Sequence, residues 1–178
     1  IGIPGTIGGG IKMNSGAFGS EFKDVLIDVK AINHDGKYKI FSNKDLKMKY
    51  RKIDLKNEWI FLSARFKTSL STNESIKNKM KKIIQSRKNA QPTGVKTGGS
   101  TFKNPLEQTD KKVWELIQRS VPLDISFGDA AISNKHYNFL VNKGNASFKD
   151  MKNLVEYIQK NVKSKTGVSL EPEIEIVD

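Results

Sequence analysis

The segment Thr97-Gly98-Gly99-Ser100-Thr101-Phe102-Lys103-Asn104-Pro105 brings two glycines, a hydroxyl, a cation and an amide together within nine residues. The paired glycines let the backbone turn freely and let a ligand approach the main chain closely, with Ser100 directly after them. Lys103 and Asn104 add a positive charge and a side chain that both donates and accepts hydrogen bonds. Pro105 lacks an amide donor and ends any strand that starts at Ser100. Composition alone is equally compatible with an ordinary surface turn, so the rest of the chain has to decide.

The overall composition is that of a globular protein with a strong positive charge. The chain has 178 residues, 37% of them hydrophobic, with no cysteine, two histidines and a net charge of +12. Cysteine chemistry is therefore excluded, a metal site is not expected, and a reducing cytoplasm is the expected compartment. No apolar run approaches the roughly 20 residues that span a bilayer, so membrane insertion is not expected. The charge favours an anionic partner, or it reflects a lysine-rich composition without functional meaning.

Residues 1–19 form a glycine-rich opening that contains seven glycines. The spacing of these glycines does not give the dinucleotide fingerprint that follows a strand in Rossmann domains. Backbone amides of such a segment can still cradle a phosphate or a flat ring. The alternative is a flexible linker, which the interleaved Ile3, Ile7 and Ile11 make less favourable.

Periodicity then predicts an α+β arrangement with a domain boundary near residue 90. Two strands are expected over residues 24–40, with Val25, Ile27, Val29 and Ala31 on one face and a turn at His34-Asp35-Gly36. A third strand is expected over residues 58–68. The next element is a helix, for which Ser71 and Glu74 form a capping box. Periodicity ends at residues 89–99.

The second region repeats the mixture of helix and strand. A helix is expected over residues 110–120, with Val113, Trp114 and Ile117 inward. Short strands follow at 131–133 and 139–142. Residues 147–167 give the clearest helix, with Ser147 as its cap and Gly167 as its stop. A closing strand is expected over residues 168–177, where glutamates alternate with apolar residues.

Four features, in this order, resemble the UDP-N-acetylenolpyruvoylglucosamine reductase family of bacterial cell-wall synthesis. They are GIPGTIGG with Asn14-Ser15-Gly16-Ala17; Tyr50-Arg51; GGSTFKNP with Ser133-Asn134-Lys135-His136-Tyr137-Asn138-Phe139; and Leu170-Glu171-Pro172-Glu173. The ordered set covers nearly the whole chain.

The resemblance implies an α+β fold in three parts. Residues 1–89 would be the C-terminal part of a PCMH-type FAD-binding domain, 90–167 a smaller α+β substrate-binding domain, and 168–178 a C-terminal strand with a catalytic glutamate. The family's N-terminal flavin subdomain is expected to precede Ile1 and to be missing from these 178 residues. The short segment between Arg51 and Ser100 looks like the family branch that lacks an extra tyrosine-bearing loop.

The resemblance also implies an activity. Family members reduce UDP-N-acetylglucosamine enolpyruvate to UDP-N-acetylmuramate, passing a hydride from NADPH to FAD and then to C3 of the enolpyruvyl group. A proton must reach C2, and the resemblance assigns its donor to Ser100 and the stabilisation of the intermediate to Arg51 and Glu173. The implied partners are the UDP-sugar and NADPH in a cytoplasmic monomer, without nucleic acid.

The remaining site residues follow from the same resemblance. The expected FAD contacts are Ile3, Pro4, Gly5, Thr6, Gly8, Gly9, Asn14, Gly16 and Ala17. The expected substrate contacts are Tyr50, Arg87, Lys103 and Asn104. No metal is implied, and His136 is expected to be structural.

The chemistry of these side chains is consistent with the implied roles. A guanidinium can hold the substrate carboxylate in a bidentate pair. A serine is a poor acid in water, so Ser100 must be positioned and relieved of charge, for which Lys103 is a candidate. Glu173 can help only if it is protonated or acts through water.

Other interpretations stay open. Arg51 could be a solvated cation beside Lys49 and Lys52, and Glu173 could lie on the outward face of a strand. The chain could be another flavin oxidoreductase with the same domain type, although the GGSTFKNP and LEPE pair argues against this. A basic nucleic-acid-binding module is less favoured, because few aromatic residues accompany the lysines.

Overall fold

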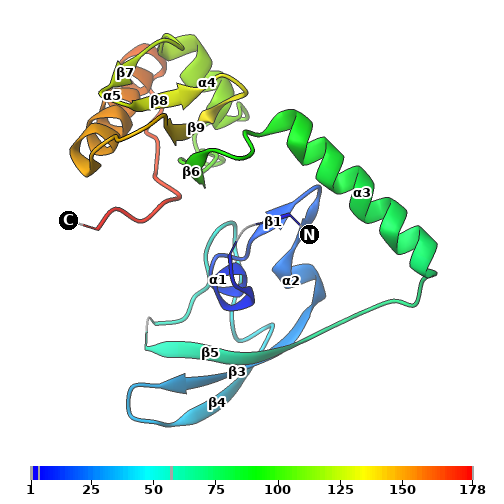
Figure 1. Ribbon diagram of the computed structural model, residues 1–178. Helices are drawn as coiled ribbons and strands as arrows, with labels where there is room; N and C mark the ends of the chain where they lie inside the picture. The colour runs from blue at the N-terminus through cyan, green and yellow to red at the C-terminus, as the bar shows by residue number, and fades with distance from the viewer. Residues whose placement is uncertain (1, 4, 57, 178) are drawn as a thin grey trace. The chain divides into compact units, whose positions relative to one another are not determined.

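The computed structural model describes residues 2–3, 5–56 and 58–177. The chain divides into two compact units, residues 1–84 and 85–178, and the division falls within one long helix. Each unit has its own buried core. The ribbon in Figure 1 follows the chain from the blue N-terminal unit to the yellow and red C-terminal unit.

The first unit is built on a three-stranded antiparallel sheet with the order β4-β3-β5. Its elements are α1 (Ile7–Lys12), β1 (Gly16–Ala17), β2 (Ser20–Glu21), α2 (Phe22–Val25), β3 (Leu26–Asn33), β4 (Tyr38–Ser42) and β5 (Trp59–Phe66). The predicted turn between β3 and β4 is confirmed, because Gly36 has a φ of 77° and its amide donates to the carbonyl of Asn33.

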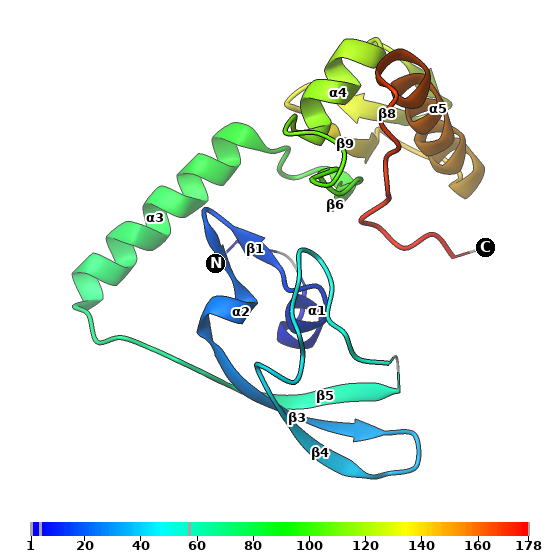
Figure 2. The same ribbon diagram turned by 180° about the vertical axis from the view of Figure 1, so that it is seen from behind.

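Figures 1 and 2 show α1 lying over one face of this sheet. The buried residues between helix and sheet are Ile11, Leu26, Val29, Ala31, Phe41 and Leu46. The predicted common face of Val25, Ile27, Val29 and Ala31 is only half right: Val29 and Ala31 are buried, whereas Ile27 is exposed and Val25, also exposed, is the last residue of α2. A register shift between Leu26 and Asp28 changes the alternation at the start of β3, so that Leu26 is buried and Ile27 is exposed.

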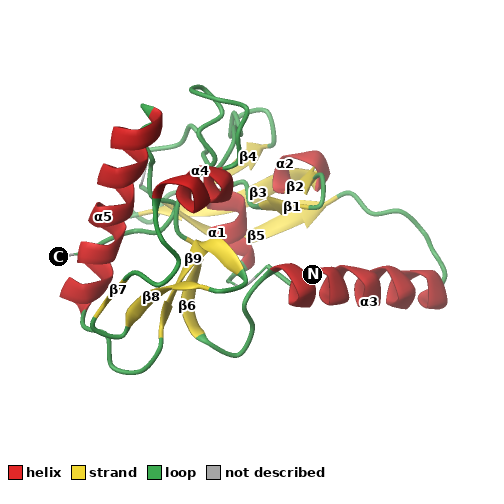
Figure 3. Cartoon of the chain, turned by 90° about the horizontal axis from the view of Figure 1, so that it is seen from above, coloured by secondary structure: helices red, strands yellow, loops and turns green. Residues whose placement is uncertain are grey.

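The helix α3 (Asn73–Ala90) is one uninterrupted helix, as Figure 3 shows. Its predicted capping box is wrong by one residue. The hydroxyl of Thr72, and not that of Ser71, accepts the amide of Ser75 at 3.2 Å. A side-chain oxygen just before the first helical residue satisfies one of the amides that have no partner within the helix, which is why the helix begins there.

The second unit contains a four-stranded antiparallel sheet with the order β6-β9-β8-β7, and its strands lie side by side in Figure 3. Its elements are β6 (Lys96–Ser100), α4 (Val113–Ser120), β7 (Ser126–Phe127), β8 (Ala130–Ser133), β9 (His136–Asn142) and α5 (Phe148–Thr166). The two predicted strands correspond to β8 and β9. The strand β7 was not predicted, because two residues are too short to show a period.

Both helices of the second unit pack against one face of its sheet and share one core. The buried residues are Phe102, Val113, Leu116, Ile117, Val121, Ala130, Ile132, Leu140, Leu154, Val155, Ile158, Val162, Val168 and Leu170. Both predicted ends of α5 are confirmed. Ser147 accepts the amide of Asp150, and Gly167 has a φ of 75° at the C-cap.

One inward residue of α4 was predicted wrongly. Trp114 keeps 40% of its surface exposed, whereas Val113, Leu116, Ile117 and Ser120 are buried. These four positions are spaced three, four and seven residues from the first, which defines a single helix face. Trp114 lies at the flank of that face.

The predicted closing strand over residues 168–177 is not regular. Within the described residues, this segment forms one isolated bridge, between Phe102 and Pro172. Pro172 has no amide to donate to a ladder, and β6 ends at Ser100, so the two segments pair over only a few residues.

Candidate functional site

Ser100 lies at the end of β6, where a glycine bends the strand. Gly99 has a φ of 86°, a conformation that glycine adopts without steric cost. The pairing of β6 with β9 shifts in register between Thr97 and Ser100, and Ser100 pairs with Phe139. Gly99 and Ser100 thus belong to an irregular strand end, and the role predicted for Ser100 stays a prediction.

The register also places Ser100 on the sheet face opposite the helices. Leu140 belongs to the core beneath α4 and α5, so its neighbours Phe139 and Val141 face the other side. Ser100 and Thr97 pair with these two residues and share their face. The Ser100 residue is half-buried there.

The C-terminal segment runs along the other side of the Ser100 stretch. The amide of Glu173 donates to the carbonyl of Thr101 at 2.8 Å, and the amide of Lys103 donates to the carbonyl of Glu171 at 2.9 Å. Two residues distant in the sequence, Ser100 and Glu173, are thereby brought to neighbouring places on the main chain.

Two glutamine side chains tie this C-terminal segment to the rest of the second unit. The side chain of Gln108 forms two hydrogen bonds with the backbone of Ser169. Its Nε2 donates to the carbonyl at 2.8 Å, and its Oε1 accepts the amide at 2.9 Å. Gln159 of α5 donates to the carbonyl of Leu170 at 2.9 Å. The backbone before Glu173 is therefore fixed from two sides.

Lys103 and Asn104 have partners that the sequence did not reveal. The ammonium of Lys103 forms an ion pair with the carboxylate of Glu171. The carbonyl oxygen of the Asn104 side chain accepts the amide of Val113 at 3.0 Å, at the first residue of α4. Asn104 therefore has a structural role in starting α4, and its predicted contact with the substrate stays a prediction.

Arg51 lies in the first unit and is not the solvated cation of the alternative interpretation. Its guanidinium donates to the carbonyl of Asn14 at 3.4 Å and to that of Gly16 at 3.2 Å, and lies 4.0 Å from the Glu21 carboxylate. It also stacks at 4.8 Å from the ring centre of Tyr50. Only 16% of the side chain is exposed.

Asn14 is fully buried beneath this arginine. Its amide nitrogen donates to Glu21 at 3.1 Å and to the carbonyl of Lys49 at 3.0 Å, while its oxygen accepts the amide of Lys23 at 2.9 Å. The side chain thus joins the glycine-rich opening to the segment that carries Tyr50 and Arg51. We assign it this structural role; its predicted contact with FAD stays a prediction.

Gly16 and Ala17 form the short strand β1, which pairs with β2. A Cβ at Gly16 would lie 2.6 Å from Cγ of Glu21 and 2.7 Å from the carbonyl oxygen of Ser20. The glycine is therefore required by the close approach of the two strands. This packing requirement is independent of any cofactor.

The other predicted cofactor residues lie at the beginning of the first unit. The hydroxyl of Thr6 accepts the amide of Gly9 at 3.1 Å and starts α1. Gly5 has a φ of 119°, and no atom lies within 4 Å of the place where its Cβ would be. Ile3 is exposed, and a Cβ at Gly8 would touch only Phe61 and Thr6 at ordinary distances. The prediction for Pro4 lies outside the described residues.

Two residues of β9, His136 and Asn138, form side-chain contacts that were not predicted from the sequence. His136 accepts the amide of Asn138 at 3.1 Å through Nδ1 and packs edge-on against Phe139 at 4.9 Å. Burial lowers the pKa of His136 below its usual value, which favours the neutral ring that can accept this bond. In the sequence, the one sign of a special role for Asn138 is its position as a polar residue beside the apolar run Phe139-Leu140-Val141.

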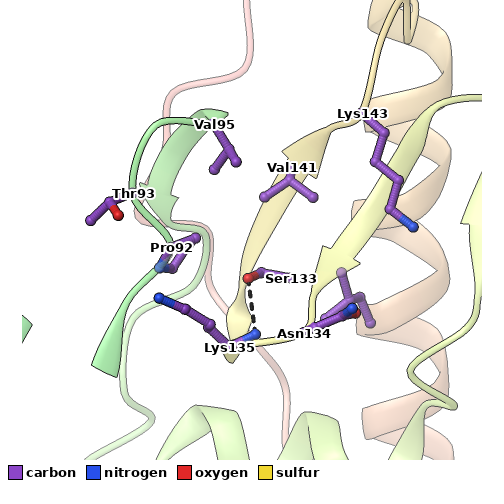
Figure 4. Close-up of a pocket in the computed structure, with 9 residues that line it drawn as sticks. Pro92, Thr93, Val95, Ser133, Asn134, Lys135, Val141 and Lys143 are labelled. Atoms are coloured by element: carbon purple, nitrogen blue, oxygen red, sulfur yellow. Dashed lines mark hydrogen bonds between the residues drawn. The ribbon is translucent and has the colours of Figure 1, made fainter. Parts of the chain in front are cut away.

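A shallow pocket of about 290 Å³ lies between the segment before β6 and the β8–β9 hairpin (Figure 4). Its lining is formed by Pro92, Thr93, Val95, Ile132, Ser133, Asn134, Lys135, Val141 and Lys143. The amide of Lys135 donates to the hydroxyl of Ser133 at 3.2 Å. One lining residue, Val141, shares its sheet face with Ser100.

The predicted site residues are thus divided between the two units. Tyr50 and Arg51 belong to the first, whereas Arg87, half-buried on α3, belongs to the second with Ser100 and Glu173. Their joint action stays a prediction. Across the described residues, no helix combines the length and apolar character needed to cross a membrane.

Comparisons with known proteins cover almost the whole chain. Residues 91–177 match the family described as "UDP-N-acetylenolpyruvoylglucosamine reductase, C-terminal domain". The reductase of Pelagibacter ubique (strain HTCC1062) is 56% identical over 175 residues, which are 98% of this chain and 58% of that protein. The reductase of Orientia tsutsugamushi (strain Boryong) is 45% identical over 177 residues, 99% of this chain and 57% of that protein.

A solved structure agrees with the sequence relatives. The crystal structure of UDP-N-acetylenolpyruvylglucosamine reductase from Thermus caldophilus superimposes with a TM-score of 0.83 at 35% identity. The match covers 98% of this chain and 61% of that one, so the chain spans about three fifths of the length of these relatives. Sequence and structure therefore agree, and the chain belongs to the UDP-N-acetylenolpyruvoylglucosamine reductase family.

Proposed function

We propose that this chain takes part in the NADPH-dependent reduction of UDP-N-acetylglucosamine enolpyruvate to UDP-N-acetylmuramate, in the cytoplasm. The observation that carries the proposal is the main-chain pairing that sets Glu173 beside the Ser100 stretch. This pairing lies within residues 91–177, the part that matches the reductase family. In this proposal residues 1–89 contribute to the FAD site, residues 90–167 bind the UDP-sugar, and residues 168–178 supply Glu173.

The reaction reduces a carbon–carbon double bond, so it needs a hydride at C3 and a proton at C2. We assign the proton to the hydroxyl of Ser100, whose backbone lies at the bent end of β6 and pairs with Phe139. General acid catalysis by a positioned side chain is worth about 10²–10⁴-fold in rate. Glu173 is proposed to stabilise the intermediate, either as the protonated acid or through water. The ammonium of Lys103, paired with Glu171, lies on the same short segment and adds positive charge.

Arg51 is proposed to face the carboxylate of the enolpyruvyl group. Negative charge that develops at C2 spreads into this carboxylate, and a guanidinium stabilises such charge. The support from the structure is that Arg51 is held in a defined conformation by two carbonyls and the ring of Tyr50. A preorganised cation needs little reorganisation during the reaction. Arg87, Lys103 and Asn104 are proposed for the UDP group, with Tyr50 as a further substrate contact.

We propose that the first residues of the chain contribute to the binding site of a flavin nucleotide. The open space beside Gly5 and its positive φ allow a ligand to approach the backbone closely. Ile3, Gly5, Thr6, Gly8 and Gly9 are the described residues that would hold FAD there. Bound FAD would supply the hydride that NADPH provides. Asn14, Gly16 and Ala17 are proposed as further FAD contacts.

The test is to purify the intact gene product, record its absorbance for bound flavin, and follow NADPH oxidation with and without the UDP-enolpyruvyl sugar. We expect a flavin spectrum and a rate of NADPH oxidation that depends on the sugar. A flavin-containing protein whose NADPH oxidation ignores the sugar would overturn the proposed substrate. Colourless protein that gains no activity with added FAD would overturn the proposed chemistry.

A further inference from the structure

Asn138 is a buried strand residue whose side chain takes the place of a backbone partner. It is 3% exposed. Its Oδ1 accepts the amide of Phe102 at 2.9 Å, and its Nδ2 donates to the carbonyl of the same residue at 2.8 Å. The carboxamide therefore pairs with Phe102 as the peptide group of a neighbouring strand would.

The main chain of Asn138 is also occupied on both sides. Its carbonyl accepts the amide of Thr101 at 2.8 Å, and its own amide donates to Nδ1 of His136 at 3.1 Å. Pairing between β6 and β9 has Ser100 and Phe139 as its last partners. Asn138 thus forms hydrogen bonds to Thr101 and Phe102, the two residues that follow the last pair of the β6–β9 ladder.

The stretch fixed by Asn138 is the one that holds Glu173. Thr101 accepts the amide of Glu173 through its carbonyl, while its amide is bound to Asn138. Phe102 lies between the carboxamide of Asn138 and the bridge to Pro172. Residues 101–102 therefore connect Asn138 on one side with the C-terminal segment on the other.

We propose that Asn138 is a positioning residue for proton delivery: its carboxamide sets the place of Ser100 relative to Glu173 through the backbone of residues 101–102. This inference rests on the proposed function of Ser100 and Glu173. Asn138 acts through the backbone and not on the substrate. A shift of about 1 Å in a catalytic group can cost about 10²-fold in rate, which is why such a support matters.

An amide is required at this position because Phe102 presents both a donor and an acceptor. Asn138→Asp keeps the shape but replaces the donor by an acceptor, so that two oxygens face each other in a buried place. Asn138→Gln keeps both hydrogen-bonding groups and moves them outward by one methylene. The first variant breaks the pairing, whereas the second displaces it.

A matched control lies on the same strand. The side chain of Asn142 accepts the amides of Gly144 and Ala146 and donates to the carbonyl of Ala146. It therefore holds a turn, and Asn142 pairs with Lys96 at the far end of β6 from Ser100. Asn142→Asp removes a comparable donor without touching residues 101–102.

The test measures kcat, KM and hydrogen–deuterium exchange on the intact gene product and its three variants. We expect Asn138→Asp and Asn138→Gln to lower kcat by about 10²-fold with little change in KM. The solvent isotope effect on kcat should increase, because proton transfer becomes slower. In both Asn138 variants, the amide hydrogens of residues 100–104 and of residues 171–175 should exchange faster than in the parent protein. Asn142→Asp should leave kcat and these exchange rates unchanged.

Two results would overturn the positioning role. One is a wild-type kcat in a folded Asn138→Gln protein. The other is a loss of kcat that merely follows the loss of stability across all three variants, including Asn142→Asp. If Asn138→Asp does not fold, Asn138→Gln decides by the same criteria. If the parent protein does not reduce the sugar, the proposed function is refuted. Faster hydrogen exchange in residues 100–104 and 171–175 of the Asn138 variants would still test whether Asn138 fixes these two segments.

Discussion

Gly16 and Gly8 were both predicted to contact FAD, and alanine at each position separates a packing role from a binding role. At Gly16 a Cβ would lie 2.6 Å from Cγ of Glu21 and 2.7 Å from a backbone carbonyl. Strands β1 and β2 would have to move apart, and overpacking of this kind costs about 1–3 kcal/mol. At Gly8, inside α1, the nearest atom would be 3.9 Å away, and replacing a helical glycine by alanine gains about 0.5–1 kcal/mol.

We therefore expect Gly16→Ala to be less stable than Gly8→Ala by about 1.5–4 kcal/mol in the free energy of unfolding. Urea titration followed by tryptophan fluorescence measures this difference. Trp59 packs against Phe41 in the first unit, so a Trp114→Phe background isolates its signal. Gly8→Ala should be at least as stable as the parent protein but bind FAD more weakly. Equal unfolding free energies for the two variants would refute the packing argument.

Three further outcomes follow from the structure. Leu154→Ala, at a residue with no exposed surface, should lower the free energy of unfolding by about 2–5 kcal/mol, and a loss in urea titration below that range would contradict the assigned core. Glu171→Gln should cost less than about 1 kcal/mol by the same titration, because 71% of the Glu171 side chain is exposed; a larger loss would give its pair with Lys103 a greater structural role. Burial lowers the pKa of His136 in the folded state below the unfolded value of 6.5, so the unfolded state binds protons first and stability should fall as pH decreases through 6.5 toward the folded pKa. His136→Gln should flatten this part of the stability curve, and an unchanged slope would exclude His136 as its source.

Local patterns predicted the elements whose ends are fixed by local chemistry. Ser147 and Gly167 define α5 because a side-chain cap and a left-handed residue satisfy the helix ends without help from the rest of the fold. The Ser100 stretch was recognised for a similar reason, since Gly99 determines its backbone geometry.

Features that depend on distant residues could not be predicted in this way. The alternation of residues 168–177 has the period of a strand, but pairing depends on whether a partner strand continues, and β6 ends at Ser100. Asn14 and Asn104 look like ligand-binding amides in the sequence. In the structure their partners, such as Lys49 and Val113, lie elsewhere in the chain. The same holds for Asn138 and Phe102, which are 36 residues apart.

In the proposed reaction, the hydroxyl of Ser100 delivers the proton that completes reduction of the enolpyruvyl double bond. The most direct test of this step compares substrate-dependent NADPH oxidation in the intact gene product and in Ser100→Ala, with the flavin content of both proteins matched. We expect NADPH to reduce the bound flavin of Ser100→Ala at the parent rate, while turnover of the sugar falls by about 10²–10⁴-fold. A Ser100→Ala protein that turns over the sugar at the parent rate would contradict this assignment.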